Sequence, residues 1–209
     1  KYEFFENLPI YIFITIIVII ISIFVTIKLS FPFWNLQPVY HTYDFWRILY
    51  REPFYIHKRF VSKNINKFTQ LNRVETHNYL DMIHKDKELM VDLLQCYFTH
   101  EDSIFVFNVE NLDAYFTGHT INSYISFYKL GTDKVGCISS RSCNLDFKQY
   151  NKQFPIYFID FLCLKRGDNQ THDLRTLMQT HIYQTQQCSQ MNAFIFKREK
   201  DLLSGIVPF

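Results

Sequence analysis

The sequence predicts an α+β domain, with a mixed sheet flanked by helices, behind one N-terminal transmembrane helix. Residues 8–27 (LPIYIFITIIVIIISIFVTI) form a run of 20 without a charged side chain. Apolar residues recur at helical spacing over residues 73–97 and again over residues 173–186. Between these two segments the apolar period changes to two, which is typical of β-strands. Helices and strands in this order favour a sheet covered by helices.

The composition excludes several classes of protein. The 209 residues include 22 Lys and Arg against 20 Asp and Glu, a net charge of +2, which indicates neither a strongly basic nucleic-acid-binding protein nor an acidic tail. Aromatic residues make up 18% of the chain, too many for a disordered protein. The 22 Phe, 14 Tyr and 23 Ile are residues of A/T-rich codons and indicate an A/T-rich genome, and only 5 Gly argue against a glycine-rich nucleotide loop.

The uncharged run of residues 8–27 is long enough for a transmembrane helix. At about 1.5 Å of rise per residue it crosses a hydrocarbon core of about 30 Å. Aromatic residues flank it as at a membrane interface, with Phe4 and Phe5 before it and Phe33 and Trp34 after it. The alternatives are a signal peptide and a buried core helix. The run lacks the basic segment and small-residue cleavage site of the first, and the second would be unusually apolar for so small a chain. We therefore expect Leu8–Ile27 to lie in a bilayer.

The charges around this run predict its orientation. Lys1 is the basic residue before it, whereas six Lys and Arg residues follow over positions 28–63. The positive-inside rule then gives a single-pass protein with its soluble domain on the cytoplasmic side. The opposite orientation would make Asn169-Gln170-Thr171 available as a glycosylation sequon.

Three segments are expected along the chain. Residues 1–29 form the transmembrane anchor. Residues 30–72 are aromatic and interrupted by three prolines, so that we expect an extended arm there. Residues 73–209 form the α+β domain.

Within the domain, Pro155–Leu164 (PIYFIDFLCL) is apolar on both faces and is expected to be a central strand. Ser103–Val109 is expected to be a strand or a strand-like loop. The other expected elements are strands at Ser123–Leu130, Val135–Ser140 with Ser142–Phe147 as an extension, and Ala193–Lys197, a turn at Gly131–Asp133, and a short helix at Leu112–Phe116.

Four blocks of sequence occur in an informative order. Phe33–Val39 (FWNLQPV) is similar to Phe-Trp-x-Thr-Gln-Pro-Val, and residues 94–107 (LQCYFTHEDSIFVF) are similar to a Leu-x-x-Asn-Tyr-Val-Glu-Asp-Asp loop followed by Phe-Arg-Phe. Residues 135–139 (VGCIS) resemble Val-Gly-Phe-Ile-Ser, and Ile159–Leu164 (IDFLCL) resembles Ile-Asn-Phe-Leu-Cys-Val. These are motifs of the N-myristoyltransferase family. The resemblance covers residues 33–209, the first of that enzyme's two similar halves, and implies the acyl-CoA N-acyltransferase fold.

The C-terminal segment carries a further resemblance. Residues 196–208 (FKREKDLLSGIVP), with Leu177–His181 (LMQTH) before them, look like the myristoyltransferase-like proteins of large nucleocytoplasmic DNA viruses. The A/T-rich residue usage fits such a genome. This resemblance implies a viral protein of the virion inner membrane or capsid, with capsid or membrane proteins as partners.

In the resembled enzymes, backbone N–H groups of the central strand stabilise the thioester oxyanion, and no side-chain nucleophile is used. These donors map to Phe161 and Leu162, so that Cys163 is expected to be a core thiol. The resemblance implies acyl-CoA as a substrate and no resident cofactor. The residues that would contact acyl-CoA are Phe33, Trp34, Gln37, Cys163, Leu164, Asn169, Gln170, Thr171 and His172.

The loop that would hold the CoA pyrophosphate departs from the family pattern. Such a site needs free N–H groups at a helix N-terminus and nearby cations. Lys165 and Arg166 supply positive charge, but Asp168 and Asp173 flank the anion site, and Gly167 alone supplies a glycine. A nearby carboxylate repels a phosphate by about 1 kcal/mol or more. We therefore expect the CoA site to be lost or weakened.

Other candidate clusters are weak. The five Cys are widely spaced without a C-x-x-C pair, so that reduced, mostly buried thiols are expected. His77 and His84 share a helix face at a spacing of seven, but no third ligand has metal spacing, and no metal site is predicted. Glu101 and Asp102 either resemble the acidic loop that meets the peptide in the family or form a solvated turn.

These observations favour a membrane-anchored, non-catalytic acyltransferase-like protein with a structural or docking role. The anchor holds the domain near one bilayer, the pyrophosphate loop departs from the pattern, and the 209 residues end before the second half that delivers the family's catalytic C-terminal carboxylate. The alternative is an active acyl-CoA-dependent N-acyltransferase that transfers a myristoyl or acetyl group to an amine. No nucleic-acid partner is expected.

Overall fold

The computed structural model describes residues 8–30, 49, 52–53, 68–98, 106–165, 167, 169–189, 191 and 193–197. The chain divides into two units, Lys1–His57 with Phe209, and Lys58–Pro208. Each unit is described by itself. Most of the arm predicted at residues 30–72 lies outside the described residues.

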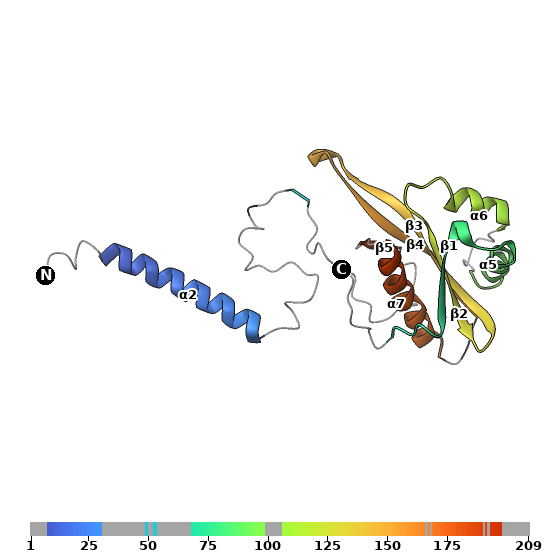
Figure 1. The fold of residues 1–209 in the computed structure, drawn as a ribbon, viewed down its shortest axis with the longest axis horizontal. Helices are drawn as coiled ribbons and strands as arrows, with labels where there is room; N and C mark the ends of the chain where they lie inside the picture. Colours follow the sequence, from blue (N-terminus) through green and yellow to red (C-terminus); the bar gives the residue numbers. More distant parts are fainter. Residues whose placement is uncertain are drawn as a thin grey trace. The chain divides into compact units, whose positions relative to one another are not determined.

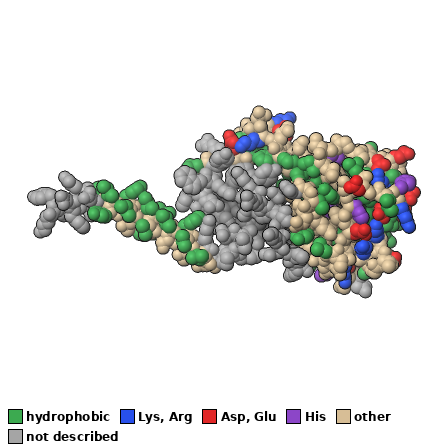
Figure 2. Space-filling view, in the orientation of Figure 1, with side chains coloured by type: hydrophobic (Ala, Val, Ile, Leu, Met, Phe, Trp, Pro, Cys, Tyr) green, Lys and Arg blue, Asp and Glu red, His purple; other side chains and the backbone are tan. Residues whose placement is uncertain are grey.

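Helix α2 (Leu8–Ser30) accounts for the described helix of the first unit. Residues Pro9–Ile27 have a mean hydropathy of 3.1, and their side chains are exposed (Figure 2). The hydroxyls of Thr15 and Thr26 donate to carbonyls four residues earlier, each at 2.8 Å, so that these polar groups are satisfied within the helix as lipid requires. By length and composition, α2 is sufficient to cross a membrane.

The second unit contains a five-stranded sheet whose strands follow one another in sequence order (Figure 1). The first four strands pair antiparallel with one another in succession, and the fifth pairs parallel to the fourth. The fourth strand therefore has a neighbour on each side, which confirms the interior strand predicted there. The strands are β1 (Val74–Asn78), β2 (Tyr124–Leu130), β3 (Asp133–Phe147), β4 (Lys152–Leu164) and β5 (Phe194–Phe196).

Glycine is required at one close contact of β3 with β4. Gly136 lies opposite Leu164, and a Cβ at this position would be 2.5 Å from the Leu164 Cδ1 and 2.8 Å from the Cys163 carbonyl oxygen. Any larger side chain would push the two strands apart. Gly131, in the predicted β2–β3 turn, has a φ of 66° that glycine adopts without strain.

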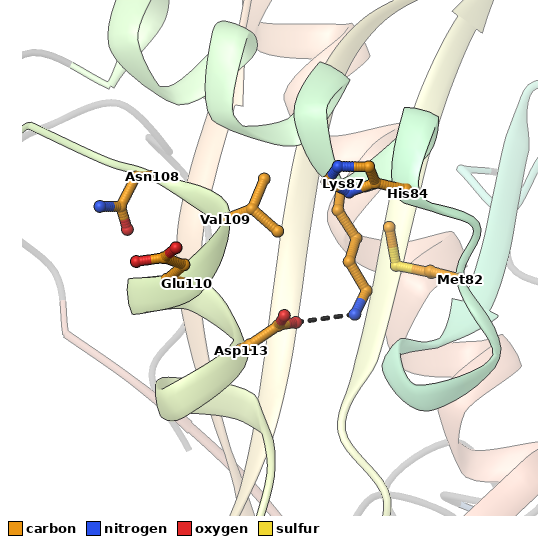
Figure 3. Close-up of a pocket in the computed structure, with 7 residues that line it drawn as sticks. All are labelled: Met82, His84, Lys87, Asn108, Val109, Glu110 and Asp113. Carbon is orange, nitrogen blue, oxygen red and sulfur yellow. Dashed lines mark hydrogen bonds and ion pairs between the residues drawn. The ribbon is translucent and has the colours of Figure 1, made fainter.

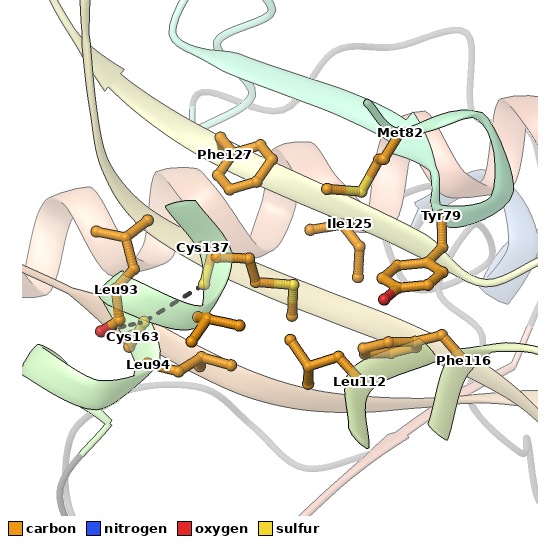
Figure 4. Close-up of a cluster of buried hydrophobic side chains, with 12 residues drawn as sticks. Tyr79, Met82, Leu93, Leu94, Leu112, Phe116, Ile125, Phe127, Cys137 and Cys163 are labelled. Atoms are coloured by element: carbon orange, nitrogen blue, oxygen red, sulfur yellow. Dashed lines mark hydrogen bonds between the residues drawn. The ribbon is translucent and has the colours of Figure 1, made fainter. Parts of the chain in front are cut away.

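Helices cover both faces of the sheet (Figure 1). Alternate residues of β2 divide between the faces, because Ile125 and Phe127 join the core beneath α5 and α6 (Figure 4), whereas Tyr128 packs with residues of α7. The covering helices are α5 (His84–Tyr97) and α6 (Val109–Phe116) on one face and α7 (Gln170–Ser189) on the other.

The helix predicted over residues 73–97 is wrong in its first half. Residues 74–78 (VETHN) form the edge strand β1, a 3-10 turn follows at Tyr79–Asp81, and α5 begins only at His84. The β-branched Val74 and Thr76 suit a strand, and pairing with β2 buries Val74 to 1% exposure. Tertiary pairing thus outweighs a helical apolar spacing that continues correctly from residue 84.

Of the strand or strand-like loop predicted at Ser103–Val109, the described part is not a strand. Residues 106–108 have no strand structure and Val109 opens α6, while residues 103–105 lie outside the described residues. The Asn108 side chain accepts from the Asn111 backbone N–H at 2.7 Å and so caps α6. Elsewhere the predicted strands and α7 are confirmed, with ends shifted by a few residues.

Candidate functional site

A β-bulge interrupts β4 between Asp160 and Cys163. Cys137 of β3 is paired with Cys163 and Ser139 with Asp160, so that Phe161 and Leu162 together oppose one β3 residue. Phe161 has a φ of 52°, in the left-handed region that a bulky residue rarely adopts. Such strain persists only where the surroundings enforce it, and it is frequent at functional sites.

An aromatic clamp around the Phe161 ring enforces this conformation. Its centroid lies 5.3 Å from that of Tyr115, 5.6 Å from those of Phe98 and Phe107, and 6.0 Å from that of Phe116. Three of the four contacts are edge-on, a geometry that aromatic pairs favour. The bulge is therefore held by two side chains of α6 and by Phe98 and Phe107, which lie between α5 and α6 in the chain.

The bulge also coincides with a stretch of β4 that β5 does not cover among the described residues. Strand β5 pairs with β4 only over Tyr157–Ile159. Among the described residues, β4 therefore has no β5 partner over Asp160–Leu164. An unpaired edge presents backbone N–H and C=O groups to whatever binds there.

Asp160 occupies one of the two backbone donors predicted for this site. The Phe161 N–H donates to the Asp160 Oδ1 at 2.8 Å, and the Tyr115 hydroxyl donates to the Oδ2 at 3.0 Å. Burial, reinforced by the Asp160 charge, raises the pKa of Tyr115 to about 12, so that this phenol stays a donor at neutral pH. The carboxylate is thus fixed directly over the bulge.

A cation lies behind this pair. The Arg141 guanidinium is 4.3 Å from the Tyr115 ring centroid and 5.9 Å from that of Phe158, both within cation–π range. Sequence reasoning missed Asp160, Tyr115 and Arg141. The one available signal was Asp160, which stands where the resembled block has asparagine; nothing in the sequence pattern singles out the other two.

Cys163 and Leu164 are core residues in this structure. The Cys163 Sγ lies 3.4 Å from the Cys137 Sγ, and both side chains are buried. Contact with the second thiol and burial raise the pKa of Cys137 well above its ordinary value, so that it remains a thiol. Leu164 packs in the core beneath α7.

The predicted pyrophosphate residues gather at the N-terminus of α7. Gln170 is its first residue, and the Asn169 carbonyl accepts from the Asp173 N–H at 3.0 Å. Thr171 and His172 are exposed in the first turn, where helical N–H groups favour an anion. Phe33, Trp34 and Gln37 lie outside the described residues.

Asp173 places a negative charge in that same turn. Its Oδ1 accepts from the Tyr128 hydroxyl at 2.7 Å and lies 3.5 Å from the His172 Nδ1. Arg73 in turn donates to the Tyr128 hydroxyl at 3.1 Å. The Asp173 carboxylate is therefore fixed by Tyr128 of β2, and it supplies a negative charge at the N-terminus of α7.

The structure also has an open depression of about 580 Å³ whose lining does not include Asp160, Phe161 or Leu162 (Figure 3). Lys87 and Asp113 bridge it at 2.7 Å, and the Tyr79 hydroxyl donates to the same Asp113 oxygen. The Lys87 and Asp113 charges thus neutralise each other. The lining residues are Met82, His84, Lys87, Asn108, Val109, Glu110 and Asp113.

Comparisons with known proteins bear on the fold. No protein-family model and no curated protein matches the sequence. Among solved structures, Saccharomyces cerevisiae N-myristoyltransferase with bound myristoyl-CoA superposes with a TM-score of 0.51 at 18% identity, over 79% of this chain and 39% of that enzyme. A predicted acetyltransferase from Clostridium acetobutylicum gives 0.45 at 7% identity, over 61% of this chain and 82% of that one.

A further match is an aminoglycoside acetyltransferase from an uncultured soil sample, with a TM-score of 0.43 at 15% identity, over 62% of this chain and 78% of that one. At such identities the likeness concerns the fold. The sheet order, the bulged fourth strand and the match to the yeast enzyme agree with one another. The second unit has the acyl-CoA N-acyltransferase fold, in a chain whose N-terminal helix is long and apolar enough to cross a membrane.

Proposed function

We propose that this chain is a membrane-tethered protein whose acyltransferase-fold domain is non-catalytic and has a structural or docking role. One observation carries the proposal: the Phe161 N–H, an expected oxyanion donor, already donates to the Asp160 carboxylate at 2.8 Å. The fold is retained, but the place where acyl transfer would develop negative charge holds a negative charge of its own.

The energetic consequence is large enough to matter. Removing one oxyanion donor from an enzyme typically lowers kcat about 10²- to 10³-fold. A second negative charge about 4 Å away adds on the order of 4 kcal/mol of repulsion at an effective dielectric constant of about 20. The two effects act on the same thioester oxygen, and the carboxylate of Asp160 causes both.

The N-terminus of α7 supports the same proposal. A CoA pyrophosphate there would meet Asp173, whose carboxylate is fixed by Tyr128 rather than turned away by rotation. Among the described residues of the connection from β4 to α7, Lys165 carries the positive charge. Its backbone N–H donates to the Val135 carbonyl at 2.9 Å. Weak phosphate binding and a blocked oxyanion donor favour a role that needs neither.

We place α2 in a bilayer, with the domain on the cytoplasmic side and in contact with membrane or capsid proteins. The mean hydropathy of 3.1 over Pro9–Ile27 and the internal bonding of its hydroxyls support the membrane assignment. The viral part of the proposal, a virion inner membrane, rests on the A/T-rich usage and on the resemblance of residues 196–208.

An active acyl-CoA-dependent N-acyltransferase is the second candidate. The bulge at Phe161 and the unpaired β4 edge over Asp160–Leu164 favour it, because they leave room for a thioester beside backbone donors. The two candidates differ in whether acyl-CoA binds at all.

Thermal unfolding with and without myristoyl-CoA and CoA separates them, using the full chain in detergent micelles. A ligand at 100 times its Kd adds about 2.7 kcal/mol of stability, which raises Tm visibly. We expect no shift for the wild type and a gain of binding in Asp160→Ala, which removes both the charge and the acceptor. Asp160→Asn removes the charge alone, and Asp146→Ala, an exposed β3 carboxylate, is the matched control.

Stabilisation of the wild-type protein, followed by acyl transfer to an amine acceptor, would establish the enzyme instead. Absence of binding in both Asp160 variants would show that Asp160 is not what blocks the site. In that case the proposal would have to rest on the α7 N-terminus, and Asp173→Asn is the variant that tests it.

A further inference from the structure

The interface between α7 and the sheet contains buried polar atoms without partners. The His181 ring is fully buried, and its Nδ1 lies 2.6 Å from the Ser126 Oγ. Its Nε2 has no hydrogen-bond partner among the described residues, and neither has the Ser140 or the Thr185 hydroxyl. Buried polar atoms in native proteins are nearly always bonded, either to protein or to ordered water.

Proton counting along the chain of bonds fixes the His181 tautomer. The Gln184 Nε2 donates to the Val74 carbonyl at 3.3 Å, so that its Oε1 faces Thr76 and accepts the single Thr76 proton. Thr76 must then accept from Ser126, to which it is also bonded. The single Ser126 proton is used in that bond, and Ser126 therefore accepts from the His181 Nδ1–H.

The His181 Nε2 is consequently an unprotonated acceptor that faces the protein interior. A neutral imidazole carries one proton, which the counting places on Nδ1. No described residue donates a hydrogen bond to this Nε2. The imidazole is neutral, because burial lowers the pKa of His181 to about 3.

Register places the Ser140 hydroxyl on the same side of the sheet and close by. Ser126 pairs with Ile138 and Tyr124 pairs with Ser140, so that Ser140 is the diagonal neighbour of Ser126 on the face beneath α7. Diagonal neighbours stand about 7–8 Å apart, a gap that one small molecule between them fills.

Helix periodicity brings Thr185 to the same place. Thr185 follows His181 by one turn on the buried face of α7. Along α7, Asp173 meets Tyr128 and His181 meets Ser126, so that the helix runs toward the β2 N-terminus. The next turn, at Thr185, therefore lies level with Tyr124 and its partner Ser140.

We infer that the interface between α7 and the sheet binds an internal water molecule that donates to the His181 Nε2 and bridges to the hydroxyls of Thr185 and Ser140. The three groups provide the two to four polar partners that buried waters typically have. The site is enclosed and uncharged, which suits water rather than an ion. Among the described residues, no group of three or more His, Cys, Asp or Glu is arranged to hold a metal.

Substitutions that remove one hydroxyl at constant shape test the site in the full chain in detergent micelles. Thr185→Val and Ser140→Ala each take one hydrogen bond from the water, and we expect each to lower the folding equilibrium constant about twofold to tenfold. The double variant should lose less than the product of the two, because both act on one water. Ser142→Ala, which removes a direct 3.0 Å bond to the Ile121 carbonyl, should combine multiplicatively with Thr185→Val.

Nitrogen-15 NMR of the His181 ring gives a readout independent of stability. We expect the proton on Nδ1, an unprotonated Nε2, and magnetisation transfer from water to the His181 ring protons. The inference is overturned if Thr185→Val stabilises the protein, as removal of an orphaned hydroxyl would. It is equally overturned if Nε2 carries the proton or if water transfer is absent.

Discussion

The sheet face beneath α5 and α6 is filled by rings and aliphatic side chains, whereas the face beneath α7 carries a connected set of buried hydroxyl, amide and imidazole groups. The first includes Phe116, Phe127 and the Phe161 clamp. The second includes Thr76, Ser126 and His181. The apolar face stabilises the fold through buried apolar surface, whose contribution does not change with pH. The polar face stabilises it through directional hydrogen bonds, which depend on the protonation state of His181.

The candidate site combines features of the two faces, because it lies on the apolar face but contains the Asp160 carboxylate. Asp160 and Phe161 both point to the apolar face, because the bulge turns two successive side chains the same way. A polar carboxylate therefore lies within an aromatic clamp, and ring contacts and the bond from the Phe161 N–H to Asp160 act on the same strained residue. Four substitutions or conditions distinguish the contributions of the two faces.

The largest expected effect is on the apolar face. Phe116 is 2% exposed and contacts the rings of Tyr79, Tyr115 and Phe161. Phe116→Ala should lower the free energy of unfolding by about 3–5 kcal/mol, from lost burial and the cavity left behind. Urea titration followed by near-ultraviolet circular dichroism measures this loss. A loss under about 1 kcal/mol would show that the aromatic clamp contributes little to the stability of the core.

The next effect concerns the strand pairing common to both faces. Gly136→Ala places a Cβ against the Cys163 carbonyl, and the strands must move to admit it. We expect a loss of about 1–3 kcal/mol, as for other overpacked sites. Gly167→Ala is the matched control, because nothing lies within 4 Å of a Cβ there. Equal stabilities of the two variants would refute the close-contact argument.

The polar face should respond to acid. The pKa of His181 is lowered to about 3 in the folded protein, against about 6.5 when unfolded, so that the unfolded state binds more protons between these values. Stability from this group is lost as the pH falls through about 6.5, by about 1 kcal/mol between pH 6.5 and 5.5 and by about 1.4 kcal/mol per pH unit between about 5.5 and 4. Unfolding at pH 6.5 and 5.5, with His181→Gln subtracted, measures the slope. An identical slope in the variant would contradict the assignment.

The smallest effect is at the rim of the apolar face. Lys87 bonds Asp113 at 2.7 Å and lies 4.6 Å from the Tyr79 ring centroid. Lys87→Met should cost about 0.2–1 kcal/mol, the usual range for pairs near the surface. The difference from wild type should shrink in about 1 M NaCl, where the Debye length is about 3 Å. A salt-independent difference would assign the effect to packing of the lysine stem.

Sequence periodicity predicted the elements whose burial is regular. The alternation of β2 and the apolar run of β4 predicted strands, and the spacing of Leu174, Leu177 and His181 predicted the buried face of α7. The helix predicted at residues 74–78 was wrong, because a short edge strand depends on the strand that it pairs with more than on its own sequence pattern.

The predicted donors, Phe161 and Leu162, lie at the bulge, but the sequence did not reveal what surrounds them. The φ of Phe161 depends on rings of α6 that are 45 or more residues earlier in the chain. Tyr115 reaches Asp160, and its ring meets Arg141, only where α6 packs on the sheet. Such contacts have no local sequence signature, and a structure is needed to find them.

The carboxylate over the bulge also has a genetic consequence. Aspartate and asparagine codons differ only in their first base, so that one point mutation exchanges the charged side chain at position 160 for the neutral amide of the resembled block. The aromatic clamp, the bulge and the open strand edge would all survive that exchange, since none of them depends on the charge. The charged and the uncharged site are therefore separated by a single nucleotide.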